Sequence, residues 1–207
     1  LLILGVFKKN SENLVYNFTI LILLILLALI VNLTSVDKTY LFNESYVIDD
    51  LSTFMKILTV GAGIFVMIAS SKYLKFTKIF KIEYPVLLMS CILGMLVMIS
   101  SNDLIVFYLG LEIQAIALYV LASFNRDNLL SAESGIKYFV LSALSSGLLL
   151  YGCSLIYGFS GTTNFNLISE NNVDEINYGI TFGIVFILVG LAFKISAVPF
   201  HMWAPDV

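Results

Sequence analysis

The sequence predicts an all-α integral membrane protein, a bundle of about seven transmembrane segments. Of its 207 residues, 59% are hydrophobic and only 12% are charged, whereas soluble domains average roughly 45–50% apolar and about 25% charged residues. Apolar runs of about 20 residues, the length that crosses a bilayer core, recur along the chain. A chain of this size cannot bury so many apolar side chains internally, so we expect lipid to be its solvent.

Seven hydrophobic stretches account for the expected spans. Helices are expected in each, because every backbone amide in lipid must be hydrogen bonded within its own segment. The sixth stretch is long enough to tilt, and Gly147, Gly152 and Gly158 within it suit close helix packing. Pro199 is expected to end the seventh. In order, the predicted segments are 1–7 (the tail of a first span), 14–33, 51–73, 84–100, 104–124, 131–159 and 178–198.

Basic residues fall in alternate loops, which predicts the orientation by the positive-inside rule. Lys8 and Lys9, four lysines within 72–81, and Arg126 lie in loops on one side. The other loops contain only Lys38 and collect most of the acidic residues. This alternation fits seven crossings and predicts an N-terminus outside and a C-terminal segment that returns to the inner side.

The composition also excludes several kinds of site. The two cysteines, Cys91 and Cys153, are far apart in apolar stretches, and His201 is the single histidine. Haem, iron–sulfur and zinc sites need clustered cysteine or histidine ligands, so we expect no metal and no redox cofactor in this chain. A net charge of −3 without a basic patch argues against nucleic acid as a partner.

Three ionisable residues, Glu112, Lys137 and Lys194, lie within predicted spans. Each costs roughly 2.5–3.5 kcal/mol to insert, so the three together indicate a pathway or a paired site. The short connection 125–130 makes an antiparallel hairpin of the fifth and sixth segments, and we therefore expect Glu112 to face Lys137. Lys56, near the outer start of the third segment, is expected to extend outward to the interface.

Lys194 lies one turn before Pro199, and helix breaks in membranes are tolerated where the backbone lines a cavity. His201 follows, and histidine changes its charge near neutral pH. These residues predict a proton relay of Glu112, Lys137, Lys194 and His201. Other interpretations remain open: a static Glu112–Lys137 ion pair that only orients helices, a Lys194 that extends to the inner interface, and a His201 that is merely interfacial.

Three stretches carry a family resemblance. They are 101–122, which contains Leu109-Gly110-Leu111-Glu112; 131–163, which begins Ser131-Ala132-Glu133-Ser134-Gly135-Ile136-Lys137; and 190–207, which contains Phe193-Lys194-Ile195-Ser196. Together they resemble the subunit N family of the proton-pumping NADH:quinone oxidoreductase, complex I, whose mitochondrial members are called subunit 2. The third stretch is typical of the wider antiporter-like superfamily. The likeness extends from about residue 51 to the end.

The resemblance implies an inverted-repeat antiporter-like fold with a broken helix in each repeat. Residues 1–207 are then expected to form a single transmembrane domain, the N-terminal part of a longer subunit, which stops at the break of the first repeat. The chain begins without methionine and ends directly after a motif, which also predicts a piece of a longer protein. The resemblance places the family's relay residues on Glu112, Lys137 and Lys194, with His201 following.

The function implied is proton translocation in response to electron transfer in other subunits. NADH, FMN, the iron–sulfur clusters and quinone are expected in the partner subunits of complex I, both membrane and peripheral. The expected location is the bacterial inner membrane, with the mitochondrial inner membrane as the alternative. Two rival functions are a subunit of a cation/proton antiporter and a structural subunit whose buried charges only fix the packing.

Overall fold

The computed structural model describes residues 12–32, 38–171 and 177–207, and these ranges are almost entirely helical. Six of the seven predicted segments are helices, which confirms the predicted fold class; the first, 1–7, lies outside the described residues. The helices are α2 (Glu12–Asn32), α3 (Asp50–Phe76), α4 (Glu83–Ile99), α5 (Leu104–Ala122), α6 (Leu129–Ser160), the short α7 (Phe165–Asn171) and α8 (Tyr178–Lys194). Four of them (α2, α3, α5 and α6) are long and apolar enough to cross a membrane, and α4 and α8 are shorter apolar helices of 17 residues.

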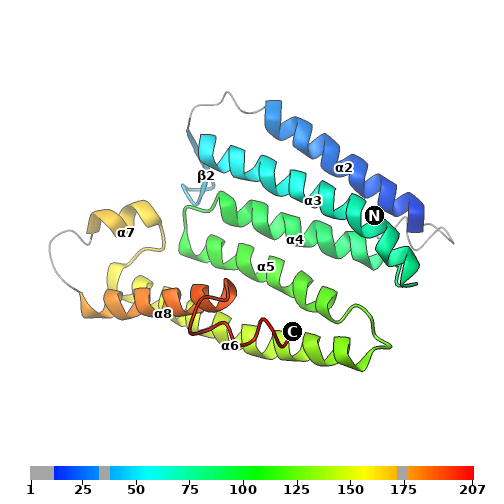
Figure 1. The fold of residues 1–207 in the computed structure, drawn as a ribbon. Coiled ribbons are helices and arrows are strands. Elements are labelled where there is room, and N and C mark those ends of the chain that lie inside the picture. Colours follow the sequence, from blue (N-terminus) through cyan, green and yellow to red (C-terminus); the bar gives the residue numbers. More distant parts are fainter. Residues whose placement is uncertain (1–11, 33–37, 172–176) are drawn as a thin grey trace.

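The helices lie side by side in chain order from α2 to α5, and α6 and α8 complete the bundle (Figure 1). The most extensive packing is between α6 and α8 and between α4 and α5. One apolar cluster joins α2, α3 and α4 around Leu23, Met67 and Ile92. A second joins α5, α6 and α8 around Leu149 and Cys153.

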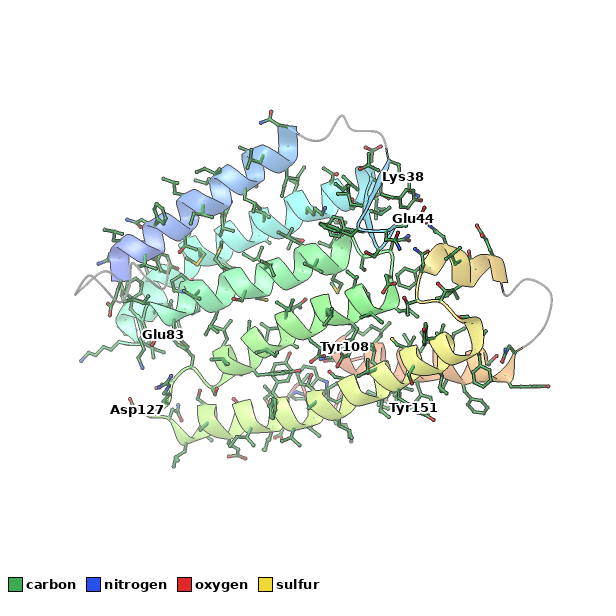
Figure 2. All side chains as sticks on the ribbon, turned by 180° about the vertical axis from the view of Figure 1, so that it is seen from behind. Lys38, Glu44, Glu83, Tyr108, Asp127 and Tyr151 are labelled. Carbon is green, nitrogen blue, oxygen red and sulfur yellow. The ribbon has the colours of Figure 1, made fainter. Side chains whose placement is uncertain are left out.

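A short β-hairpin, which was not predicted from the sequence, connects polar loops at one end of the bundle by hydrogen bonds. Strands β1 (Thr39–Leu41) and β2 (Tyr46–Ile48) pair antiparallel. The hairpin meets the α4–α5 connection through two backbone bonds, in which the Val47 N–H donates to Ser100 O and the Asn102 N–H donates to Ser45 O. Figure 2 shows Lys38 and Glu44 at this end and Glu83 and Asp127 at the opposite one. The loop with Lys38 and Glu44 therefore lies at one end, and the loops next to Glu83 and Asp127, which carry Lys78, Lys81 and Arg126, lie at the other, as the alternation of basic loops predicts.

Helix α8 ends at Lys194, so the prediction that it continues to residue 198 is wrong. Ser196 has a positive φ of 55°, outside the helical region. The Ser196 N–H donates to Phe193 O, and the Ala197 N–H donates to Ala192 O. This is a Schellman motif, which satisfies carbonyl groups that the helix end leaves open. Pro199 disfavours helix at the residue before it, and the motif stops the helix further upstream.

Glycines allow two helix pairs to approach to backbone contact. A Cβ at Gly94 of α4 would lie 2.6 Å from the Gln114 nitrogen of α5. In the α6–α8 pair, a Cβ at Gly152 would lie 2.7 Å from Gly183 O. Gly152 is thus a packing residue as predicted. The prediction is wrong for Gly147 and Gly158, which are exposed and have nothing within 4 Å of their Cβ positions. Small residues at such crossings are the usual basis of close packing between membrane helices.

Replacing Gly94 by alanine is expected to destabilise the protein, because the new methyl group meets backbone atoms that cannot move aside. Overpacking of this kind costs roughly 1–3 kcal/mol. Thermal unfolding of the detergent-solubilised full-length subunit measures the loss. Gly147→Ala is the matched control on an open helix surface, and equal melting temperatures for the two variants would contradict the close α4–α5 contact.

Candidate functional site

A cluster of polar side chains lies between α5, α6 and α8. Lys194, the last residue of α8, points its ammonium group at three oxygen atoms. Its Nζ lies 2.9 Å from Ser142 Oγ, 3.3 Å from Tyr119 Oη and 3.4 Å from Glu112 Oε1. Ser146 Oγ donates a hydrogen bond to the same carboxylate oxygen of Glu112. An ammonium group has three donors, so all three have acceptors in this cluster.

These partners are almost enclosed by the bundle. The side chains of Lys194 and Glu112 are 12% and 22% exposed, and Ser142, Ser146 and Tyr119 are buried. A charge in such surroundings needs an opposite charge and full hydrogen bonding to be tolerated. The ion pair and the hydroxyl groups supply both.

Helix periodicity explains why these residues meet. Glu112 and Tyr119 are seven residues apart, two turns of α5, and Ser142 and Ser146 are four apart on α6, so each pair shares one face. The end of α8 is held against this face because Ser145 Oγ donates to Gly190 O over 3.1 Å. Gly190 has no side chain, and α8 therefore approaches α6 closely one turn before Lys194.

The expected contact between Glu112 and Lys137 is not present, and that prediction is wrong. Lys137 Nζ instead lies 2.8 Å from Glu133 and 2.9 Å from Asp206, and its side chain is 38% exposed. At about 100° per residue, Lys137 points roughly 180° away from Ser146, the partner of Glu112 on α6. The partner of Glu112 among the lysines is Lys194.

The segment 195–207 folds back onto α6 through aromatic and ionic contacts. Trp203 stacks on Tyr138 with ring centroids 4.8 Å apart and on Phe193 at 5.3 Å. Its Nε1–H donates to Phe193 O, a carbonyl at the end of α8. Tyr138 in turn contacts Tyr119 edge to face at 4.8 Å. The C-terminal end of α8 is therefore linked by an aromatic chain to the cluster that holds Lys194.

The remaining predicted residues lie outside this cluster. His201 is exposed, and its side chain makes no hydrogen bond or ion pair with the described part of the chain. Lys56 lies over the Tyr46 ring at 5.0 Å, near the hairpin, as an outward-extending lysine would. No group of three or more His, Cys, Asp or Glu side chains that could hold a metal ion occurs in the described ranges.

Four residues of the site were not predicted from the sequence: Tyr119, Ser142, Ser146 and Asp206. Hydroxyl groups both donate and accept hydrogen bonds, so they can pass a proton between a carboxylate and an amine. Here the Tyr119 hydroxyl donates to Ser142 Oγ over 2.6 Å. One sequence pattern could have identified the site residues of α6: the serines at positions 142, 145 and 146 form a polar face at helical spacing.

Comparison with known proteins gives a family match, a similar sequence and two similar structures. Residues 101–207 match the family model described as NADH:quinone oxidoreductase/Mrp antiporter, TM. The chain is 69% identical over 207 residues to NADH-quinone oxidoreductase subunit N of Pelagibacter ubique, covering 100% of this chain and 44% of that protein. The chain thus spans less than half the length of this curated relative.

Two solved structures are similar in fold. The first is respiratory complex I from Thermus thermophilus with bound aureothin, with a TM-score of 0.79 and 26% identity over 95% of this chain and 42% of the other. The second is the membrane-bound sulfane sulfur reductase, an archaeal respiratory membrane complex, with a TM-score of 0.83 and 26% identity over 99% of this chain and 43% of the other.

A double-mutant cycle is expected to show coupling between Glu112 and Lys194 and none between Glu112 and Lys137. Lys194→Met alone leaves a nearly enclosed carboxylate without its cation, and adding Glu112→Gln removes that penalty. Contacting charges typically couple by about 0.5–3 kcal/mol. Thermal unfolding of the full-length subunit in detergent measures each single and double variant. Additive effects for Glu112 and Lys194, or coupling of Glu112 to Lys137 instead, would contradict the observed pairing.

Proposed function

The chain belongs to the transmembrane family shared by NADH:quinone oxidoreductases and Mrp antiporters, and from that premise we propose that it translocates protons in a respiratory NADH:quinone oxidoreductase. The 69% identity to a bacterial subunit N supports the respiratory assignment over a cation/proton antiporter. NADH oxidation and quinone reduction are assigned to partner subunits, which hold FMN and the iron–sulfur clusters. The location that fits is a bacterial inner membrane, which the chain crosses several times.

The observation that carries this proposal is the cluster around Lys194. It is an amine, a carboxylate and hydroxyl groups in continuous hydrogen-bond contact, nearly enclosed by apolar helices. The hydroxyl groups that stabilise this pair can also both donate and accept a proton, so the same groups suit proton transfer. Ionisable residues within membrane spans mark proton relays and ion pathways in general.

Each residue has a distinct part in the proposed transfer. Lys194 carries a proton on its ammonium group, and Glu112 holds the compensating negative charge. When Lys194 releases its proton toward Ser142 and Tyr119, Glu112 becomes an unpaired carboxylate, and such a group in apolar surroundings takes up a proton more readily. The pair thus alternates in charge, and the position of Lys194 at a helix end leaves its side chain room to move between partners.

Lys137 and His201 are proposed as outlying members of the relay. Lys137 is held by Asp206, and both Asp206 and His201 lie in the segment that follows the broken end of α8. This segment also contacts the cluster through Trp203 and Tyr138. Movement of the segment would therefore change the contacts of Lys137 and the packing of the Lys194 cluster at the same time.

Lys194→Ala and Glu112→Gln are expected to assemble but to pump poorly. Loss of one positioned proton-transfer group slows transfer by roughly 10²-fold or more. The measurement is NADH-driven proton uptake by inverted membrane vesicles, expressed per NADH oxidised. Lys72→Gln, an exposed lysine of α3 outside the cluster, is the matched control. A normal proton yield per NADH in Lys194→Ala would contradict the proposed relay.

Membership in a respiratory assembly is tested separately, with a tagged full-length subunit. After gentle solubilisation, the tag is expected to migrate on a native gel in a large band that reduces dye with NADH. Migration in a smaller complex without this activity would contradict the respiratory assignment and support the antiporter function, for which sodium tolerance is then the test.

A further inference from the structure

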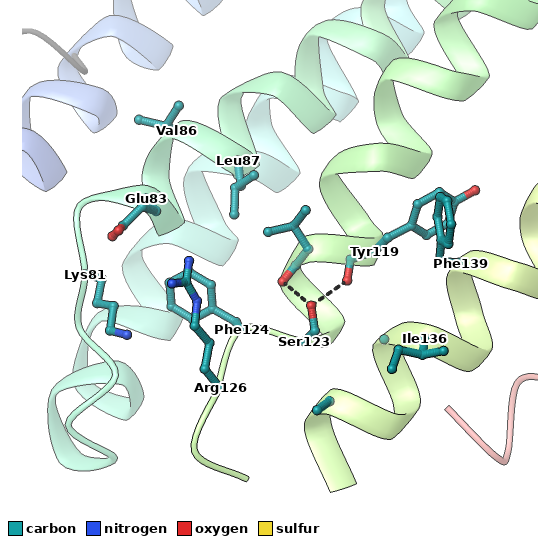
Figure 3. A pocket seen from close by; sticks show the side chains of 13 residues that line it. Lys81, Glu83, Val86, Leu87, Tyr119, Ser123, Phe124, Arg126, Ile136 and Phe139 are labelled. Carbon is teal, nitrogen blue, oxygen red and sulfur yellow. Dashed lines mark hydrogen bonds between the residues drawn. The ribbon is translucent and has the colours of Figure 1, made fainter. Parts of the chain in front are cut away.

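A cavity of about 720 Å³ lies between α4, α5 and α6 (Figure 3). It is near the end of the bundle where Figure 2 shows Glu83 and Asp127. Its walls are mainly apolar and include Leu87, Phe124 and Phe139. The volume is in the range of ligand pockets, about 300–1,000 Å³. The cavity is separate from the ion pair of Glu112 and Lys194, neither of which lines it.

The few hydroxyl groups near this cavity already donate hydrogen bonds to other groups of the protein. The Ser123 hydroxyl turns back to its own helix and donates to the carbonyl oxygens of Tyr119 and Val120 (Figure 3). The Tyr119 hydroxyl donates to Ser142 on the side of the cluster. Ordered water needs two to four polar partners, and an apolar cavity is a poor site for it. The interior of this cavity therefore suits a hydrocarbon chain better than water.

The mouth of the cavity is charged. Lys81, Glu83 and Arg126 are exposed and line it, and none of the three forms a salt bridge within the part of the chain that the structure describes. The charged residues that line the mouth are two cations and one anion, which gives the lining a net charge of +1. The surrounding loops are also the basic ones, on the predicted inner side.

We propose that this cavity is a binding site for an anionic phospholipid, with one acyl chain between α4, α5 and α6 and the phosphate between Lys81 and Arg126. Basic pockets between transmembrane helices on the inner side recognise anionic head groups, and burying each methylene of the chain adds favourable transfer free energy. The bound chain lies against Tyr119, a residue of the Lys194 cluster. The site does not depend on the proposed function.

The test uses the assembled complex with full-length subunit in phosphatidylcholine nanodiscs doped with photoactivatable phosphatidylglycerol. Cross-links are expected on peptides of α4, α5 and α6 that line the cavity, and excess unlabelled phosphatidylglycerol, but not phosphatidylcholine, is expected to reduce them. Each basic residue replaced, Lys81→Gln or Arg126→Gln, is expected to lower the labelling about fivefold. Lys72→Gln on α3 is the matched control and leaves labelling unchanged.

Two further variants keep the test decisive if the charge variants assemble poorly. Ala132→Phe adds a ring to the cavity wall with its charges intact, and is expected to abolish labelling there. Glu83→Gln is expected to raise labelling by phosphatidylglycerol, because it removes the anion among the described residues that line the mouth. Absence of cross-links at the cavity, labelling indifferent to both basic residues, or a preference for phosphatidylethanolamine that Glu83→Gln weakens would overturn the proposal.

Discussion

The enclosed ammonium group of Lys194 is the constraint on which the rest of the site depends. Hydrocarbon cannot solvate a charge, so the bundle itself must supply an anion and hydrogen-bond acceptors for it. Glu112 and Tyr119 come from α5 and Ser142 from α6, while the lysine comes from α8. Three helices must therefore meet at one point, and their relative rotation is fixed by which faces carry these residues.

Glycine and serine make that meeting possible. Gly152 and Gly183 let α6 and α8 touch backbone to backbone, and Ser145 anchors α8 through Gly190 O one turn before Lys194. Apolar attraction between helices is weak in lipid, so such close contacts and interhelical hydrogen bonds provide the association. Helix α8 ends in a Schellman motif, so no helical turn follows Lys194.

Hydropathy predicted six helices at the positions where they occur, because each span needs a continuous apolar run that is visible in the sequence. It also placed Glu112 and Lys194 inside the apolar bundle. The facing partner of Glu112 was predicted wrongly, since depth along a helix does not determine the direction of a side chain. That direction follows from rotation about the axis, and Lys137 and Ser146, nine residues apart on α6, point to opposite sides. The hairpin at residues 39–48 was not predicted, because its strands are three residues long and alternation is recognised over four to eight residues.

The proposed relay requires Glu112 to change its protonation during turnover, and redox-triggered infrared difference spectroscopy of the assembled complex tests this requirement directly. The carboxylic acid C=O stretch reports protonation of individual buried carboxyl groups. Turnover with NADH and quinone is expected to produce a C=O difference band that shifts in deuterated water and is missing in Glu112→Gln. Identical difference spectra for the native complex and Glu112→Gln would show that this carboxylate keeps its charge, and would contradict a role for the Glu112–Lys194 pair in carrying protons.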